Sequence, residues 1–167
     1  MLMDHPKRKN QARLLYAKLS AGCTRHLESR DNHRLFFLLK GKVGLKTEGN
    51  VEYVLYDKEF ILLPSGCIIF CSALEESDYV VINCTRLKLN SNSSYWEELR
   101  TLVNSAAVAS GPLPIRDWFE KSLEDFAFYP VSEDMYPSIY DIIFIVMRML
   151  YSKEEMLAQF LPVLHKE

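Results

Sequence analysis

The stretch that decides the fold is LKGKVGLKTEGNVEYVLYDKEFILLPSG, residues 39–66. Two runs rich in aliphatic and aromatic residues flank turns at Gly41 and at residues 48–50. A third apolar run stops at Pro64-Ser65-Gly66, where all three residue types favour a turn. This alternation of short strand-like runs and turns predicts antiparallel strands that form half of a small barrel.

Strand-like sequence extends beyond this stretch in both directions. Apolar runs begin at Arg34 and occupy residues 67–74 and 79–89, so the chain is predicted to be strand-rich up to about residue 85. The polar sequence NSNSS at residues 90–94 then marks a boundary. We therefore expect a β-barrel with a basic N-terminal segment over residues 1–89 and a different kind of subdomain over residues 90–167.

The second part of the chain has helical patterns. Ser-x-x-Glu sequences at 94–97 and 152–155 resemble capping boxes at helix starts. Apolar residues in 115–126 recur with the spacing of one helix face. Residues 139–151 are almost entirely apolar, which predicts a helix buried on most sides. The predicted fold class is α+β, with an antiparallel barrel followed by three to four helices.

Composition and charge describe an ordinary folded domain. The chain has 167 residues, of which 49% are hydrophobic and 25% charged, and its net charge is −2. The first 46 residues nevertheless carry a net charge of +8 and the remainder −10. The basic part could meet phosphate, meet the chain's own acidic half, or form a solvated face.

The sequence shows no targeting signal, which predicts a cytoplasmic protein. The start MLMDHPKRKN has no apolar core of a signal peptide. The most apolar run, residues 142–147, is too short to span a bilayer. We therefore expect no membrane partner.

Motifs for catalysis or metal binding do not stand out. The four cysteines form no CxxC pair, and His26 and His33 lack the close spacing of metal ligands. The chain has no nucleophile elbow, phosphate-binding loop or HExxH sequence. The neighbouring glutamates at 75–76, 97–98 and 154–155 point in different directions. We expect a protein that is not an enzyme and that uses no metal or cofactor.

Two segments resemble a known family. RLFFLLKGKVGL (residues 34–45) and KEFILLPSGCIIFCSALEESDYVVINC (58–84) resemble the cupin-like N-terminal sensing domain of AraC-type transcription regulators. IIFIVMRMLYSKEEMLAQFLPVL (142–164) resembles the helical linker of the version common in Bacteroidetes. The resemblance implies a sensing and dimerisation domain. In the family, DNA is bound by two helix-turn-helix motifs in a further C-terminal domain, for which this chain has no room.

The resemblance also implies a barrel without the cupin metal. The metal pattern would require histidines at Glu28, Arg30 and Ile69 and a glutamate at Arg34. An arginine offers no lone pair to a metal, so these departures remove the ligands. Such a barrel is expected to be a binding cup or an assembly scaffold.

Strand alternation predicts the lining of this cup. If Arg34 faces inward, then Phe36 and Leu38 do so too, and the same holds for Ile69 with its neighbours two positions away. The predicted ligand-binding residues are Arg30, Arg34, Phe36, Leu38, Cys67, Ile69 and Cys71. Since a charge facing an apolar cavity is costly, we expect Arg34 to pair with the carboxylate or phosphate of a small effector. The alternative is that Arg34 lies at the rim or pairs with Glu28 or Asp31.

The same sequence leaves other functions open. A homodimer is expected through Ile139, Ile142, Val146 and Met149, unless these residues form intrachain core. A stand-alone cupin-like enzyme such as an isomerase, or a stand-alone small-molecule-binding protein, is the alternative function. The enzyme would need an acid–base pair, for which Tyr53 or Tyr56 with Glu52 or Glu59 are the candidates. In a third interpretation the barrel is solid core and the domain only dimerises.

Overall fold

The computed structural model describes residues 14–29, 33–49, 51–63, 65–84, 93–102, 111–128 and 132–164. Its strands are β1 (Leu14–Leu19), β2 (Thr24–Ser29), β3 (His33–Lys40), β4 (Lys42–Thr47), β5 (Glu52–Tyr56), β6 (Glu59–Leu63), β7 (Cys67–Ala73), β8 (Ser77–Cys84) and β9 (Leu113–Pro114). Its helices are α1 (Ser93–Leu102), α2 (Asp117–Phe128), the short 3-10 helix η3 (Glu133–Met135), α3 (Tyr136–Leu150) and α4 (Lys153–Leu164).

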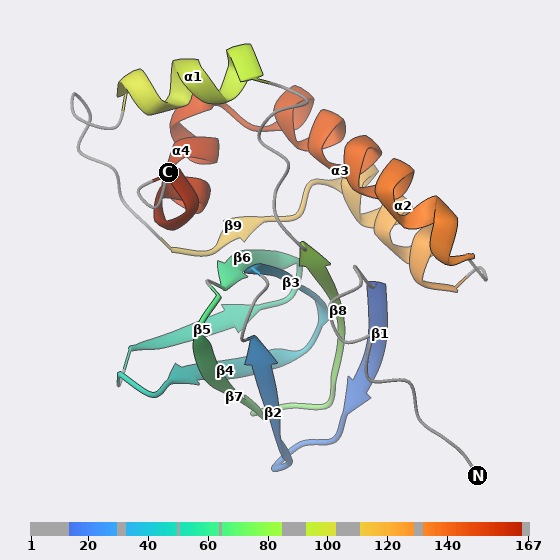
Figure 1. Ribbon diagram of the computed structural model, residues 1–167. Helices are drawn as coiled ribbons and strands as arrows, with labels where there is room; N and C mark the ends of the chain where they lie inside the picture. Colours follow the sequence, from blue (N-terminus) through green and yellow to red (C-terminus); the bar gives the residue numbers. More distant parts are fainter. Residues whose placement is uncertain are drawn as a thin grey trace, which may run out of the picture.

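The strands form two antiparallel sheets that face each other (Figure 1). One sheet, here called sheet A, has the order β1-β8-β3-β6-β9, and the other, sheet B, has the order β2-β7-β4-β5. The helices lie together on one side of this barrel (Figure 1). The predicted α+β fold class, a cupin-like barrel followed by helices, is therefore confirmed.

Strand β3 explains why residues 35–39 form a continuous apolar run. Phe36 and Leu38 belong to the cluster of buried residues between the two sheets. Leu35, Phe37 and Leu39 belong to a second cluster, which lies between sheet A and the helices. A strand buried on both faces has no position for a polar residue, so its sequence does not alternate.

Gly41 makes the connection between β3 and β4 possible. Its φ of +108° lies in a region that favours glycine, and a Cβ there would come within 2.6 Å of the Glu76 carbonyl oxygen. The Gly41 backbone N–H donates to the Asp57 carboxylate. This turn was predicted from the sequence, and its geometry requires glycine.

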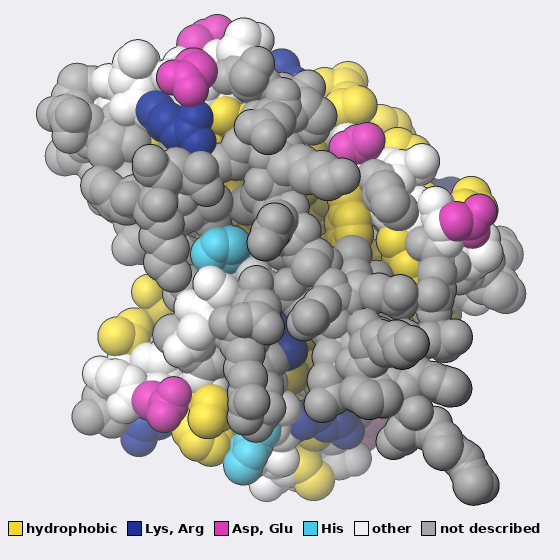
Figure 2. All heavy atoms as spheres, viewed as in Figure 1, with side chains coloured by type: hydrophobic (Ala, Val, Ile, Leu, Met, Phe, Trp, Pro, Cys, Tyr) yellow, Lys and Arg dark blue, Asp and Glu magenta, His cyan; other side chains and the backbone are white. Residues whose placement is uncertain are grey.

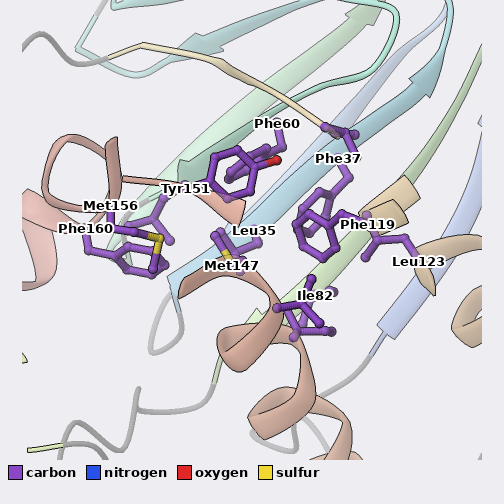
Figure 3. Packing of buried hydrophobic residues seen from close by; sticks show 14 of the residues in the cluster. Leu35, Phe37, Phe60, Ile82, Phe119, Leu123, Met147, Tyr151, Met156 and Phe160 are labelled. Carbon is purple, nitrogen blue, oxygen red and sulfur yellow. The ribbon is translucent and has the colours of Figure 1, made fainter. Parts of the chain in front are cut away.

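The helical layer packs on the outer face of sheet A (Figure 3). Phe37 and Phe60 of the sheet stack on each other, and Phe119 of α2 meets the Phe37 ring edge to face at a centroid distance of 5.3 Å. The other members labelled in Figure 3 are Leu35, Ile82, Leu123, Met147, Tyr151, Met156 and Phe160. Burial of this much apolar surface is the main force holding the helices on the barrel.

Some strands and one helix start differ from the sequence predictions. Strands β1 and β2 were not predicted, because LLYAKL and TRHLES contain few β-branched residues. Helix α1 begins at Ser93, so Ser94 is already helical and the first predicted capping box is wrong. The second box is confirmed, since Ser152 and Glu155 each accept the other's backbone N–H, at 3.1 and 2.9 Å.

Helix α3 is not buried on most sides. Ile143 and Met147 lie in the core, but Ile142, Ile145 and Met149 are 45%, 49% and 70% exposed. The prediction was wrong because an apolar helix need not be enclosed when one face lacks a neighbour within its own chain. Within the described parts of the chain, no helix has the length and apolar character needed to cross a membrane.

Candidate functional site

The inner face of β3 carries three of the predicted cup residues. Phe36 and Leu38 are fully buried in the cluster between the sheets. Arg34 lies two residues before Phe36, so the pleat directs it to the same face. Its side chain is partly buried and engaged in at least one interaction within the chain. The prediction that this face of β3 points into the barrel is therefore confirmed.

Strand β7 carries the matching residues on the opposite sheet. Ile69 and Cys71 are fully buried in the same cluster as Phe36. Cys67 lies in this strand, but its side chain is outside the described part of the structure. Arg30 falls outside the described residues altogether. The structure thus brings together five of the seven predicted residues, and their role in ligand binding stays a prediction.

The interior between the sheets is apolar and well packed. Phe36 and Tyr79 stack with ring centroids 4.9 Å apart. Further buried members of this cluster are Leu19, Leu27, Val43, Leu45, Leu55, Ile61, Leu63, Ala73 and Val81. Side chains therefore fill much of the barrel, and the polar groups of its inner face gather toward its two ends.

Arg25 is a polar inner-face residue that the sequence analysis missed. Its guanidinium donates a hydrogen bond to the Tyr79 hydroxyl at 3.2 Å. Burial raises the pKa of the nearby Cys71 thiol to about 12, although the positive charge of Arg25 opposes this shift. Cys71 is therefore a buried thiol rather than a reactive thiolate. Alternation with the buried Leu27 could have placed Arg25 on the inner face.

Asn83 lies beside Arg34 at the other end of the barrel. The two residues are directly paired between β3 and β8, and Leu63 of β6 pairs with Arg34 on its other side. Tyr79 and Val81 face the interior, so alternation directs Asn83 there as well. The Asn83 Oδ1 atom is buried and has no hydrogen-bond partner among the described residues. The sequence YVVIN contained this signal, since Asn83 shares a face with Tyr79.

The histidines of the barrel have ordinary structural surroundings. His33 Nδ1 accepts the backbone N–H of Ser65 at 3.1 Å, and the His26 ring packs edge to face on Phe70. Among the described residues, no group of three histidine, cysteine or acidic side chains could hold a metal ion. Ile69 and Arg34, which occupy places of the cupin metal pattern, are both on the inner face.

The candidate acid–base residues of an enzyme lie on β5 and at the start of β6. Tyr53 packs against the inner cluster, whereas Glu52 and Tyr56 alternate to the exposed outer face of β5. Glu59 accepts the backbone N–H of Tyr56 at 2.9 Å. The two tyrosines thus lie on opposite faces of one strand, and the pairing of either tyrosine with Glu52 or Glu59 as an acid–base pair stays a prediction.

The four predicted dimer residues fall on two different faces of α3. Ile139 and Val146 are buried in the core between helices and sheet, so this half of the prediction is wrong. Ile142 and Met149 are exposed, and Ile145 lies with them. The spacing of 142, 145 and 149 follows one helix face, which we call the α3 stripe. Figure 2 shows hydrophobic side chains at the surface in this region.

A shallow groove of about 360 Å³ separates α2 from the ends of β1, β3 and β8. It is lined by Tyr16, Leu39, Lys40, Asp57, Lys58, Asp78, Glu120, Glu124 and Phe128. Lys58 pairs with Glu120 at 3.4 Å, and burial together with Asp78 raises the pKa of Tyr16. Four acidic and two basic side chains are interspersed here, so the lining is acidic on balance.

Barrel and helices are joined by polar contacts at the edge of sheet A. The side-chain amide of Gln159 in α4 accepts the backbone N–H of Leu62 at 2.9 Å and donates to the Gly111 carbonyl. The Tyr151 hydroxyl donates to the Pro114 carbonyl and accepts the Arg116 backbone N–H. Strand β6 therefore has one face in the barrel and an edge held by α4.

The architecture is a cupin-like barrel extended by a helical layer. ToxT from Vibrio cholerae is similar in structure, with a TM-score of 0.55 and 14% identity over 84% of this chain and 57% of that chain. This chain thus spans less than two thirds of ToxT, and at this identity the likeness shows the fold alone. The sequence matches no protein-family model and no curated protein.

Other solved structures match a smaller share of the chain. A cupin 2 conserved barrel domain protein from Leptotrichia buccalis has a TM-score of 0.42 and 12% identity, over 50% of this chain and 38% of that chain. A cupin superfamily protein from Desulfitobacterium hafniense gives the same TM-score and identity, over 46% of this chain and 69% of that chain.

Proposed function

We propose that this chain is the effector-sensing and dimerisation module of an AraC-type transcription regulator. The observation that carries the proposal is the likeness to ToxT, an AraC-family protein, over both barrel and helices. The Bacteroidetes-type linker resemblance of residues 142–164 supports it from the sequence side. In this proposal, DNA is bound by a helix-turn-helix domain that is not among these 167 residues.

The effector is a small organic anion that binds at the Arg34 end of the barrel. Arg34 is a partly buried cation on an otherwise apolar inner face. A guanidinium has five N–H donors in a fork that matches a carboxylate or phosphate, so Arg34 can bind an anion beside its interactions within the chain. In the alternative, Arg34 pairs with Glu28 or Asp31, whose side chains lie outside the described residues.

The anion site is tested by titrating the isotope-labelled chain with butanoate and following its amide resonances. Arg34→Gln should abolish the shifts. Arg25→Gln is the matched control, because Arg25 is the inner-face arginine bonded to Tyr79, away from Arg34. Equal affinity of the wild type and Arg34→Gln for butanoate would refute the anion site.

Two copies associate through the α3 stripe. Ile142, Ile145 and Met149 form an exposed apolar row, and Asp141 and Arg148 lie beside it, seven residues apart. An antiparallel second copy with its twofold axis at Ile145 brings Ile142 near the partner's Met149. The same arrangement brings Asp141 near the partner's Arg148, whose guanidinium stacks on Tyr95 of its own chain at 4.3 Å, so charges of opposite sign face each other.

Sedimentation velocity at tens of micromolar tests this dimer. The wild type should sediment as a dimer and Ile145→Asp as a monomer, because a charge in the centre of an apolar contact is costly. Trp118→Asp is the control, since Trp118 of α2 is 56% exposed but is not part of the stripe. A wild type that stays monomeric at high concentration would refute the proposed dimer.

A second function is favoured by the dense packing of the barrel. Phe36, Leu38, Ile69 and Tyr79 have no measurable exposure, as expected for solid core. In that case the barrel is a scaffold and the module only dimerises. Dimerisation without any response to small acids would distinguish this function from sensing.

A further inference from the structure

We infer that the effector is a hydroxy acid, recognised at two points by Arg34 and Asn83. This inference rests on the proposed function, because it concerns the same end of the barrel. It adds a second polar residue and, with it, a second group that the ligand must carry.

The sheet register places the two side chains next to each other. Arg34 of β3 and Asn83 of β8 are directly opposite in an antiparallel pair. Side chains so paired have Cβ atoms about 5 Å apart and lie on the same face. That face is the barrel interior, as the burial of Phe36 and Val81, two residues away on each strand, shows.

The Asn83 amide carries an unexplained polar atom at this end. Its Oδ1 atom is buried and lacks a hydrogen-bond partner among the described residues. A buried polar atom without a partner costs about 1–3 kcal/mol, so such atoms are uncommon unless something binds them. A bound molecule that offers a hydrogen bond at Asn83 would remove this penalty.

The chemistry of the two residues defines the ligand class. The Arg34 guanidinium, beside its interaction within the chain, offers N–H donors that fit an anion, and the Asn83 amide fits a neutral hydrogen-bonding group beside it. A hydroxyl fits Asn83 best, since it can both donate and accept and therefore suits either orientation of the amide. Leu63 and Val81, which lie on the same face, are apolar and match a short hydrocarbon part of the ligand. A 2-hydroxy acid satisfies all three requirements.

A matched pair of acids tests the inference on the wild-type chain. Butanoate and 2-hydroxybutanoate differ only by the hydroxyl, and amide chemical shifts give a dissociation constant for each. One added net hydrogen bond should make 2-hydroxybutanoate bind roughly two- to tenfold more tightly. In Asn83→Leu, and in the milder Asn83→Ala, the two acids should bind equally.

The outcomes separate this inference from the proposed function. Equal binding of both acids to the wild type, with loss of both in Arg34→Gln, would leave the anion site standing and overturn the role of Asn83. An unchanged hydroxyl preference in both Asn83 variants would also overturn it. Absence of binding by either acid would overturn the anion site itself, and the inference with it.

Discussion

Gln159 of α4 accepts the backbone N–H of Leu62 in β6 at 2.9 Å, across 97 positions of sequence. Beyond its pairing with β9 at Glu59 and Phe60, the outer edge of β6 would present unpaired backbone groups. The Gln159 amide takes the place of a neighbouring strand there. The contact matters for sensing, because the neighbours Ile61 and Leu63 on the same strand face the barrel interior.

Replacing Gln159 by methionine should destabilise the domain by about 1–3 kcal/mol, since it leaves the buried N–H of Leu62 unpaired. Urea denaturation measures the change in the free energy of unfolding. Hydrogen exchange should quicken at the Leu62 amide, with the Val80 amide in central β8 as the internal reference. Unchanged Leu62 exchange would show that Gln159 does not hold this edge.

Removing the capping box should weaken α4. Glu155→Ala should cost about 1 kcal/mol at pH 7, because it loses the bond to the Ser152 N–H and the 3.4 Å ion pair with Arg116. Glu154→Ala is the control, as Glu154 shares the first turn and its contribution to the helix dipole. If both substitutions lower the free energy of unfolding equally in urea denaturation, the capping box does not stabilise the helix.

The Glu155 contribution should depend on pH. The Ser152 N–H, followed by Arg116, lowers the pKa of Glu155 from its ordinary value of 4.5. A lowered pKa in the folded state stabilises the fold above the unfolded value, and this stability is lost as the pH falls through the folded value. The difference in the free energy of unfolding between wild type and Glu155→Ala should thus shrink below about pH 4.5. A difference that grows on acidification would contradict this assignment.

Cys71 should resist alkylation while the protein is folded. Burial raises the pKa of its thiol to about 12, so iodoacetamide at pH 8 meets almost no thiolate there. Cys23 is exposed and should react readily. Mass spectrometry of the two peptides checks this, with urea-unfolded protein as the reference; labelling of Cys71 as fast as Cys23 would show an open barrel.

Two adjacent aromatic residues of α2 should behave differently. Phe119 is fully buried between Phe37 and Tyr151, whereas Trp118 is 56% exposed. Phe119→Ala should cost about 3–5 kcal/mol through the cavity that it leaves. Trp118→Ala should change the free energy of unfolding by no more than about 0.5 kcal/mol. Similar effects of both substitutions would contradict the described packing of α2 on sheet A.

The sequence was most informative where local chemistry alone decides the structure. The Gly41 turn, the capping box at Ser152 and the inward faces of β3 and β7 all depend on residues close together in the chain. The same reasoning could not find β9, because a two-residue strand exists only through its pairing with β6. It also divided the α3 residues wrongly, since only the position of sheet A decides which helix face is buried.

The candidate site shows the same limit. Arg34 was found from a family pattern, but its neighbour Asn83 depends on the pairing of β3 with β8, 49 residues apart. Strand alternation assigns Arg34 and Asn83 each to a face of its own strand. Only the pairing of β3 with β8 then brings the two residues side by side. Pairing between distant strands is what a single sequence does not reveal.

The central claim is that occupancy of the barrel is sensed by the helices, and one titration tests it most directly. Amide and side-chain resonances of the chain are followed while 2-hydroxybutanoate is added. The account predicts shifts at Arg34 and, with the same dissociation constant, at the Gln159 side-chain amide and along the α3 stripe. Shifts confined to the barrel, or no shifts at all, would contradict a sensing module.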